Sequence, residues 1–348
     1  MKYVIRCCTF IQCTTKPRKN RMQIFKAALL LAAVSLAPQS HGFDLPTQVL
    51  KALESYALNP DKAAGARKTA PHSDVALPAA TGNFGECREN FANGESPIVP
   101  NLKEQRARAL CFTGFAVLHS GMTKTPVYSA EVLSRERIDA SKGLKRTNKF
   151  FADARLPGAE KATLDDYQGS TFQRGHQFAA ADAENEDSMA QSFSLANMVP
   201  QSPVNNSKTW AGLEKATRAY AHRAKGNVYV ITGPAYMPQS CPFVLAAKRM
   251  LAEQNLAIPA SNSQIVSQAV ETAGFLAPRS YDAQACTVGA GVAVPSHLFK
   301  LVYDPTTQRA WAHWLENTDW ARVSAPISYD ELVRRTGIEF LPGVHPRS

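Results

Sequence analysis

An α+β fold is the fold class that the sequence predicts, and two observations lead to it. Strand-like apolar runs bounded by Gly- and Pro-bearing turns occur at 109–120, 125–134, 226–236 and 292–317, whereas 204–225 carries apolar residues at helical spacing. These segments do not alternate as regular βαβ units, which argues against a doubly wound parallel sheet. The 348 residues are enough for one large domain, or two modest ones, with a well-buried core.

The first 42 residues are typical of an export leader. They contain seven Lys or Arg and no Asp or Glu, and a charged stretch precedes the apolar run 27–37. This order predicts a signal peptide cleaved after Gly42, with Ser40 at the −3 position, and Met22 as the true start. The run is shorter than the roughly 20 residues that span a bilayer, so we expect a periplasmic or secreted protein without stable membrane insertion. The alternative for the run is a buried core helix.

The positive charge of the chain belongs mostly to this leader. The formal net charge is +10, and removing the seven leader cations leaves 10 − 7, or +3. Affinity for an acidic partner would therefore depend on local patches rather than on a global field.

The cysteines divide in the same way. Three of the seven lie in the leader, and four remain: Cys87, Cys111, Cys241 and Cys286. An even number in an exported chain predicts disulfides, for which four cysteines allow three connectivities. We favour Cys87–Cys111 with Cys241–Cys286, because each pair closes a local loop.

The remaining elements follow in order along the chain. Residues 43–80 are expected to form a short helix and a linker, and 81–345 the compact domain. Runs 109–120 and 125–134 predict a hairpin, and a strand at 228–232 is expected to end at Gly233-Pro234. Runs 292–304 and 309–317 predict a second hairpin. The helix at 204–225 presents an apolar stripe at Trp210, Leu213, Ala216 and Tyr220.

The segment Gln173-Arg174-Gly175-His176 contains the first candidates for chemistry. In an extended strand Arg174 and His176 project to the same face, and Gly175 between them is expected to leave room for a ligand. A histidine can take a proton from water, and a guanidinium can hold a phosphate, so the pair suits phosphodiester hydrolysis. Taken alone, the triplet is a weak signal, and an exposed Arg with a satisfied surface His explains it better.

The predicted helix adds three further candidates. Asn206 lies at its start, and Glu214 and Arg218 form an i, i+4 pair on one face. Each residue alone is explained by an N-cap and a solvated ion pair. Together they offer an oxygen ligand for a hard cation such as Mg²⁺, a carboxylate for its waters and a second cation for a phosphate.

These motifs together resemble the signature of the DNA/RNA non-specific endonucleases, the ββα-metal (His-Me finger) family. The match comprises the RGH triplet, the segment 195–201 (Leu-Ala-Asn-Met-Val-Pro-Gln), and Asn206 followed by Trp210, Glu214 and Arg218 at +4, +8 and +12. The similarity extends from about 105 to 343. It implies a mostly antiparallel central sheet flanked by helices, and an enzyme that cuts DNA and RNA to 5′-phosphate products.

The resemblance also implies a role for each matched residue. His176 would be the general base, Asn206 the direct ligand of Mg²⁺ (or of Mn²⁺ or another divalent cation), and Glu214 would act on the metal through water. Arg174 and Arg218 would stabilise the transition state, and Asn197 would brace the site. An inhibitor protein and the oligomeric state remain open.

One residue departs from the family pattern, which has Asp before the Arg where this chain has Gln173. Its side chain either points away from Arg174 and His176 or reaches the outer waters of the metal, so we expect weaker metal affinity rather than inactivity. The alternative is a catalytically attenuated protein that binds nucleic acid or another surface on the same scaffold. A nuclease effector delivered into other cells shares the chemistry and differs in destination.

Two histidines and a basic cluster are further candidates for a role. His297 is interpreted as structural, and His313, between Trp311 and Trp314, as part of a packed hairpin face. The basic cluster of Lys142, Lys145, Arg146 and Lys149 beside Phe150 and Phe151 either tracks a phosphate backbone or forms a solvated face.

Overall fold

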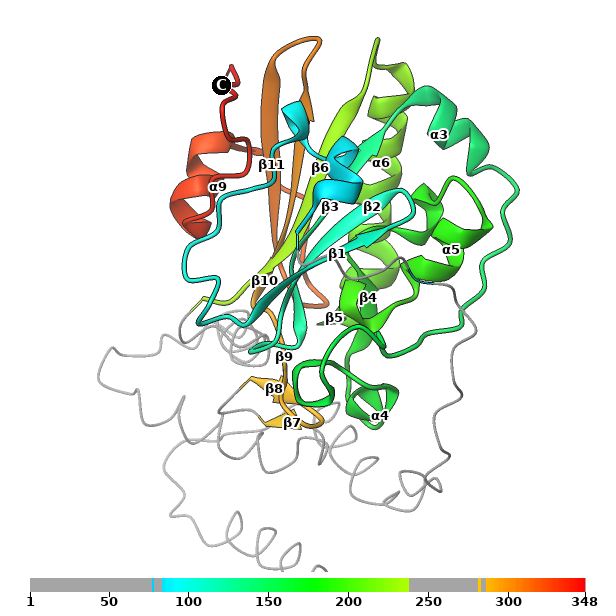
Figure 1. Ribbon diagram of the computed structural model, residues 1–348, viewed down its shortest axis with the longest axis vertical. Coiled ribbons are helices and arrows are strands. Elements are labelled where there is room, and N and C mark those ends of the chain that lie inside the picture. Colours follow the sequence, from blue (N-terminus) through cyan, green and yellow to red (C-terminus); the bar gives the residue numbers. More distant parts are fainter. Residues whose placement is uncertain (1–76, 78–82, 238–280, 283–285, 348) are drawn as a thin grey trace, which may run out of the picture. The chain divides into compact units, whose positions relative to one another are not determined.

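A seven-stranded antiparallel sheet organises the described part of the chain (Figure 1). The computed structural model describes residues 77, 83–237, 281–282 and 286–347. The predicted leader, helix and linker up to residue 76 lie outside these residues, and so does Cys241. In spatial order the strands are β1 (Ala107–Phe112), β2 (Phe115–Ser120), β3 (Thr125–Leu133), β6 (Val228–Ala235), β10 (His297–Asp304), β11 (Arg309–Glu316) and β12 (Ile327–Ser328).

Two smaller sheets and several helices surround the large sheet. One small sheet pairs β4 (Gln173–His176) with β5 (Met198–Gln201), and the other joins β7 (Tyr281–Asp282), β8 (Thr287–Val288) and β9 (Val292–Ala293). The α-helices are α3 (Arg135–Ala140), α4 (Leu164–Tyr167), α5 (Glu186–Ser192), α6 (Ala211–Arg223) and α9 (Tyr329–Thr336). The 3₁₀-helices are η2 (Gly85–Asn90), η3 (Ala92–Gly94), η4 (Gly158–Glu160), η5 (Ala180–Asp182) and η6 (Leu195–Asn197), and a π-helix, η7, spans Asn205–Trp210.

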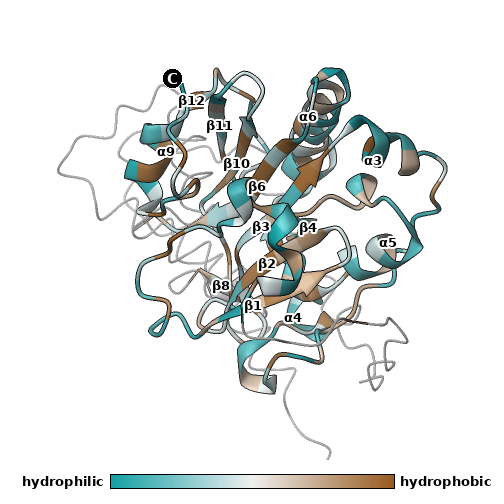
Figure 2. Ribbon diagram, turned by 45° about the horizontal axis from the view of Figure 1, so that its top comes forward, coloured by the Kyte–Doolittle hydropathy of each residue, from teal (hydrophilic) through white to brown (hydrophobic). Residues whose placement is uncertain are grey.

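Each face of the sheet has its own buried core. On one face Tyr128, Ile231 and Phe299 pack with η2 and α9. On the other face Leu133 and Val230 pack with α3 and α6, while Phe115 and Val117 pack with the segment around Phe178 and Phe193. Figure 2 shows the apolar colour along β2, β3 and β6 and both colours on α3, α6 and α9. The predicted α+β architecture is confirmed, with helices on both faces.

The first predicted strand is in fact a hairpin. Run 109–120 turns at Thr113-Gly114, where Gly114 has φ +83°, so that β1 and β2 pair with each other from Ala107↔Ser120 to Phe112↔Phe115. Gly114 allows this tight reversal because it lacks a Cβ. The predicted hairpin with 125–134 is then formed by β2 and β3.

Strand β6 is longer than predicted, because it continues through Gly233-Pro234 to Ala235. A Cβ at Gly233 would lie 2.5 Å from Cζ of Phe299, so this glycine makes room for a cross-strand aromatic ring rather than ending the strand. The hairpin predicted at 292–317 is confirmed by β10 and β11, which pair from His297↔Glu316 to Asp304↔Arg309.

The predicted helix at 204–225 is also confirmed, as η7 followed by α6. Its predicted stripe is wrong in part. Trp210 and Leu213 are buried, but Ala216 is exposed and Tyr220 is half-buried. Thr217 and Ala221 complete the buried face, and the Thr217 hydroxyl donates to the Leu213 carbonyl oxygen at 2.9 Å. A hydroxyl satisfied by the preceding turn can be buried like an apolar group, and for this reason the apolar pattern misses it.

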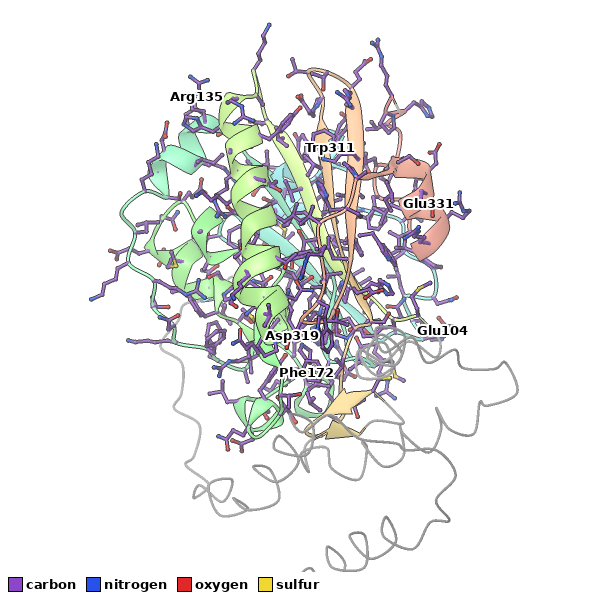
Figure 3. The ribbon with its side chains drawn as sticks, turned by 180° about the vertical axis from the view of Figure 1, so that it is seen from behind. Glu104, Arg135, Phe172, Trp311, Asp319 and Glu331 are labelled. Carbon is purple, nitrogen blue, oxygen red and sulfur yellow. A yellow bond between two sulfur atoms is a disulfide. The ribbon has the colours of Figure 1, made fainter. Side chains whose placement is uncertain are left out.

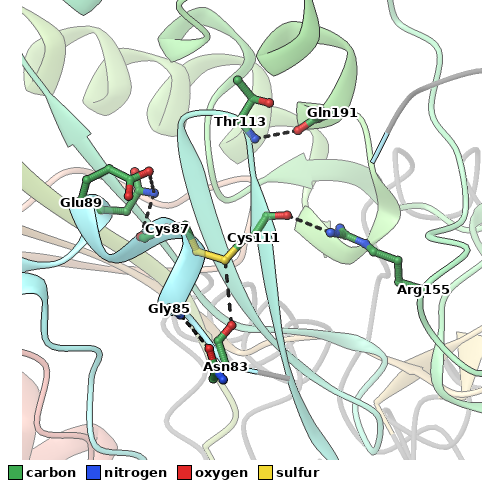
Figure 4. Close-up of a disulfide and its surroundings, with 9 residues drawn as sticks. Asn83, Gly85, Cys87, Glu89, Cys111, Thr113, Arg155 and Gln191 are labelled. Carbon is green, nitrogen blue, oxygen red and sulfur yellow. Dashed lines mark hydrogen bonds between the residues drawn. A yellow bond between two sulfur atoms is a disulfide. The ribbon is translucent and has the colours of Figure 1, made fainter. Parts of the chain in front are cut away.

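A disulfide joins Cys87 of η2 to Cys111 of β1, as predicted (Figure 4). Arg155 donates to the Cys111 carbonyl oxygen at 2.8 Å, so a third segment is attached at the same point. The other favoured pair includes Cys241, which lies outside the described residues. In the part of the chain that is described, no helix is both long and apolar enough to cross a membrane.

Candidate functional site

The strand β4 carries the RGH triplet and pairs antiparallel with β5, with Arg174 opposite Pro200 and His176 opposite Met198. The interpretation of Gly175 as space for a ligand is wrong. A Cβ at this position would lie 2.0 Å from Oε1 and 2.6 Å from Cβ of Gln201. Gly175 is therefore required by the packing of β4 against the Gln201 side chain of β5.

His176 lies in an aromatic and cationic setting. Its ring centroid is 5.7 Å from that of Phe150 and 5.0 Å from that of Phe193. The guanidinium of Arg174 lies 4.1 Å from the Phe150 centroid, and that of Arg146 lies 5.0 Å from the Phe193 centroid. Each ring therefore packs against the imidazole and also contacts one of the two guanidinium groups.

The imidazole is buried and electrically neutral. The residue is 7% exposed, and its Nε2 is buried without a hydrogen-bond partner among the described residues. Burial lowers the pKa of His176 to about 3, and the positive charges of Arg146 and Arg174 act in the same direction. A general base must start in this neutral form, because only an unprotonated nitrogen can accept a proton.

Asn206 and Gln173 are in direct contact. Asn206 lies in the π-helix η7, and its Nδ2 donates to Oε1 of Gln173 at 2.8 Å. The two residues are 33 positions apart, so this hydrogen bond joins β4 to the start of the helical segment. Of the two orientations left open for Gln173, the structure selects the one toward the candidate metal ligand.

The start of this helix is held by the loop after β11. The Asn317 side chain accepts from the Ser202 amide at 2.8 Å and donates to the Pro200 and Pro295 carbonyl oxygens, both at 2.9 Å. Asp319 accepts from the Val204 amide at 2.8 Å and from the Ser202 hydroxyl. Figure 3 shows Asp319 beside the first turns of this helical segment. The position of Asn206 is thus fixed by a segment more than 100 residues away along the chain.

Glu214 and Arg218 lie on α6, and the solvated ion pair between them, the alternative to a functional role, is not among the ion pairs of the described residues. Arg218 Nη1 binds Oδ1 of Asp182 at 2.8 Å, and Asp182 is only 3% exposed in its side chain. Burial raises the pKa of Glu214 to about 7, with Lys300 acting against this shift and Asp182 adding to it. Arg218 is held by Asp182 because a buried carboxylate needs a charged partner.

A row of buried polar groups lies beneath this helix. Lys300 is 1% exposed and donates to the Thr232 hydroxyl at 2.7 Å, and Thr232 faces Ser129 across β6 and β3. Glu131 is 2% exposed, and its pKa is raised well above the ordinary value by burial, with Asp182 adding to the shift. These groups belong to the sheet face that α6 covers.

Asn197 is wholly buried and fully hydrogen-bonded. Its Oδ1 accepts from the Ser129 hydroxyl at 2.9 Å and from the Phe178 amide at 2.8 Å. Its Nδ2 donates to the carbonyl oxygens of Phe178 and Ser192 at 2.9 and 3.0 Å. The side chain therefore ties the segment after His176 to the central sheet, the geometry of a brace.

A cavity of about 480 Å³ contains part of this site. Gln173, Arg174, Asn206 and Arg146 line it, together with aromatic rings that include Phe150, Tyr167 and Phe172. His176 does not line this cavity but packs against its lining residue Phe150, whereas Arg218 lines a neighbouring cavity. The predicted residues are therefore brought to one region, but not into a single cavity.

Two residues of this region were not assigned a role from the sequence. Arg146 is visible in the sequence only as a member of a basic cluster, whereas in the structure its charge lowers the pKa values of His176 and Glu214. Asp182 pairs with Arg218, and its only sequence signal is its place six residues after His176. His297, by contrast, lies on β10 with its Nδ1 3.0 Å from the Ser296 hydroxyl, and its ring lies 5.2 Å from that of Trp314.

Comparison with known proteins adds an independent finding. The family model described as DNA/RNA non-specific endonuclease matches residues 93–347. Nuclease 1, mitochondrial, of Schizosaccharomyces pombe is 35% identical over 128 residues, which are 36% of this chain and 39% of that protein. Human Endonuclease G, mitochondrial, is 34% identical over 145 residues, 41% of this chain and 46% of that protein. These alignments span less than half of either relative.

A longer alignment is found with Nuclease EXOG, mitochondrial, of Danio rerio, at 26% identity over 70% of this chain and 63% of that protein. A solved structure of an EndoG/EndoGI complex aligns with a TM-score of 0.48 and 19% identity over 67% of this chain and 84% of that one. The family model covers well over half of the 348 residues. The chain belongs to the DNA/RNA non-specific endonuclease family.

Proposed function

We propose that this protein is an exported, metal-dependent endonuclease that hydrolyses phosphodiester bonds of DNA and RNA. The observation that carries the proposal is the packing of the neutral His176 imidazole against the Phe150 and Phe193 rings, on which the guanidinium groups of Arg174 and Arg146 lie. An imidazolium in that position could not accept a proton, and an isolated imidazole would have no group to hold a phosphate. The combination supports phosphodiester hydrolysis.

In the proposed reaction the neutral His176 imidazole takes a proton from water as the water oxygen attacks phosphorus. The bond from phosphorus to the 3′ oxygen breaks, leaving a 3′-hydroxyl on one product and a 5′-phosphate on the other. Arg174 lines the site cavity, so its guanidinium can face the charge that develops on the phosphoryl oxygens, whereas Arg218 would act from the neighbouring cavity together with its partner Asp182. Asn197 holds the segment after His176 in register.

The residues present fit a divalent cation that has few protein ligands. The Asn206 amide nitrogen is engaged by Gln173, which leaves its Oδ1 as the free donor of oxygen type. Glu214 supplies a carboxylate whose raised pKa reflects incomplete compensation by its neighbours. Mg²⁺ accepts such a set because it keeps most of its waters; Mn²⁺ has similar preferences. When bound, the cation would neutralise charge on the phosphate and acidify nearby water.

Activity is tested directly on two substrates. Purified protein lacking residues 1–42 is incubated with supercoiled plasmid and with RNA, with Mg²⁺ or with chelator. We expect both substrates to be cut only with metal, and His176→Ala to lose at least about a hundredfold in rate. His345→Ala, at an exposed histidine, is the matched control. Absence of cleavage by the wild type with any divalent cation would leave an attenuated binding protein as the better reading.

The export proposal has its own test. The full chain is expressed in a bacterium, the cell fractions are separated, and the N-terminus of the protein is sequenced. We expect a periplasmic or secreted protein that begins at Phe43. A cytoplasmic protein that retains residues 22–42 would contradict export without affecting the nuclease assay.

A further inference from the structure

A second cavity, of about 630 Å³, lies between α6 on one side and α3 with its following loop on the other. None of the residues that line it is acidic, and five of them are Lys or Arg. The lining residues are Ile138, Ser141, Lys142, Leu144, Arg146, Ala180, Ala181, Met189, Lys215, Arg218, Ala219, His222 and Arg223. We call this cavity the flank groove.

The floor and the rim of the flank groove differ in chemistry. Ile138, Ala180 and Met189 are buried and give it an apolar floor. Lys215 and Arg223 are exposed on α6 and have no ion pair among the described residues. An apolar floor with a cationic rim matches a ligand that has apolar faces and several negative charges.

Some of the basic side chains that line the groove already have a carboxylate partner, so fewer of them are available to bind an anionic ligand. Asp139 binds Lys142 at 2.6 Å and His222 at 3.0 Å, and Asp182 binds Arg218 at 2.8 Å. Arg146, Lys215 and Arg223 are left. The chain without its leader carries a formal charge of only about +3 (10 − 7), so three unneutralised cations around one groove are a local concentration.

The flank groove shares a lining residue with the cavity of the proposed catalytic site. Arg146 lines both the flank groove and the cavity that contains Gln173, Arg174 and Asn206. A ligand that occupies both would pass along this one guanidinium. A nucleic-acid strand has the required form, because charged phosphates recur along it beside apolar sugar and base faces.

We propose that the flank groove is a second substrate subsite, which binds the nucleotides next to the scissile phosphodiester on one strand. Arg146, Lys215 and Arg223 bind the phosphates, and the floor formed by Ile138, Ala180 and Met189 contacts the sugar and base. This assignment rests on the proposed nuclease function. It predicts that substrate length matters, since a substrate with one phosphodiester cannot reach both cavities.

The test compares two substrates, a 20-nucleotide single strand and a chromogenic phosphodiester that contains a single phosphate. In the double variant Lys215→Glu/Arg223→Glu, KM for the 20-mer is expected to rise about tenfold. The ratio of kcat/KM between long and short substrates falls by the same factor. The slope of log affinity against log salt decreases by about 1.4, since each lost contact to a single strand is worth about 0.7.

Two matched controls separate the groove from general effects. Lys103→Glu/Arg106→Glu makes the same change in charge at exposed residues beside Glu104, which Figure 3 shows at a distance from α6. For shape, Ala219→Trp fills the groove, whereas Ala216→Trp places the same side chain on an exposed part of α6 outside it. The two controls are expected to behave as wild type on both substrates, and Ala219→Trp to raise KM for the 20-mer.

The outcomes are distinguishable from failure of the nuclease proposal. A wild type that cleaves neither substrate rejects the nuclease function, and the subsite with it. A wild type that cleaves both, while Lys215→Glu/Arg223→Glu and Ala219→Trp match their controls in KM and salt slope, overturns the subsite alone.

Discussion

The side-chain amide of Asn206 donates a 2.8 Å hydrogen bond to Oε1 of Gln173, and so joins the candidate metal ligand to the residue that departs from the family pattern. A glutamine can accept this bond, but it brings no negative charge. The interaction orients Asn206 without adding to the electrostatic attraction for a cation. We therefore expect Gln173 to keep the orientation of Asn206 and to attract a cation less strongly than the carboxylate of the family pattern would.

Gln173→Asp is expected to increase metal affinity. A carboxylate beside Asn206 would add an attraction to a divalent cation that the neutral amide lacks. We expect the Mg²⁺ concentration for half-maximal cleavage to fall about tenfold, measured by titration with plasmid substrate. Gln173→Asn is the control, because it shortens the side chain equally without the charge. If the two variants have the same Mg²⁺ midpoint, charge at this position does not limit metal binding.

Metal activation is expected to weaken below pH 7. The pKa of Glu214 is raised to about 7 by burial, so the metal-free folded protein binds a proton there that competes with the cation. The Mg²⁺ midpoint should rise about tenfold per pH unit as pH falls below 7. Glu214→Gln should have a high midpoint that does not vary with pH, whereas Glu104→Gln, at an exposed carboxylate, should follow the wild type. Equal wild-type midpoints at pH 6 and pH 8 would contradict this assignment.

The raised pKa of Glu214 has the opposite effect on folding stability in the absence of metal, which is expected to increase as pH falls. The folded pKa of Glu214 is about 7 and its ordinary value is 4.5. Between these pH values the folded state binds more protons than the unfolded state, so this group makes the protein more stable as pH falls through 7. In chelator, Glu214→Gln should therefore stabilise the protein at pH 8 and have little effect at pH 4.

The segments of the candidate site are predicted from the sequence because their residue types and intervals are specific. The sequence does not predict the contacts of Asn317 and Asp319, which hold Ser202 and Val204 from more than 100 residues away. Such contacts depend on how β11 ends beside η7, and the local pattern of residues in either segment does not predict that they meet. Arg146 was visible in a basic cluster, but only its stacking on Phe193 places it at the site.

Gly175 shows a different limit of pattern reading. A glycine between two functional residues suggests room for a ligand, whereas the space is occupied by Gln201 from the paired strand. The same holds for Gly233, which accommodates Phe299 and does not end β6. In both positions the reason for glycine is a side chain on another strand, and the sequence alone does not show which strands pair.

Gly175→Ala is expected to destabilise the protein by about 1–3 kcal/mol, because the new Cβ overlaps Gln201 Oε1 at 2.0 Å. Urea unfolding measures this loss. Adding Gln201→Ala to the same chain should recover part of it by removing the clash. Gly212→Ala is the control on α6, where a Cβ meets nothing within 4 Å and should add up to about 1 kcal/mol. Equal stability of Gly175→Ala and wild type would show that Gln201 moves aside freely.

Removal of the Cys87–Cys111 disulfide is expected to cost about 3 kcal/mol, since it closes a loop with a separation of 24 residues. The variant Cys87→Ser/Cys111→Ser should unfold at lower urea than wild type under oxidising conditions. The catalytic rate at low temperature should change little, because Cys87 and Cys111 belong to the core on the opposite face of the sheet from α6 and do not line the cavity of the candidate site. If reductant lowers the stability of the variant as much as that of wild type, another bond accounts for the effect.

Asn317→Ala is expected to affect stability and metal binding together. Asn317 is fully buried and makes three hydrogen bonds, so its loss leaves the Ser202 amide and the Pro200 and Pro295 carbonyls without this partner. Buried groups left unsatisfied cost on the order of 1–3 kcal/mol each, and we expect a total near 3 kcal/mol by urea unfolding.

The metal readout shows whether this residue also positions Asn206. Because Ser202 accepts the Asn206 amide hydrogen at 2.9 Å, loosening of Ser202 is transmitted directly to the candidate ligand. At a temperature where the variant is fully folded, its Mg²⁺ midpoint should rise severalfold with a smaller change in KM for plasmid. Asn227→Ala, at an exposed residue beyond α6, should alter neither quantity. A folded Asn317→Ala protein that is destabilised but keeps the wild-type Mg²⁺ midpoint would limit Asn317 to a structural role, because a displaced Asn206 cannot bind the cation as before.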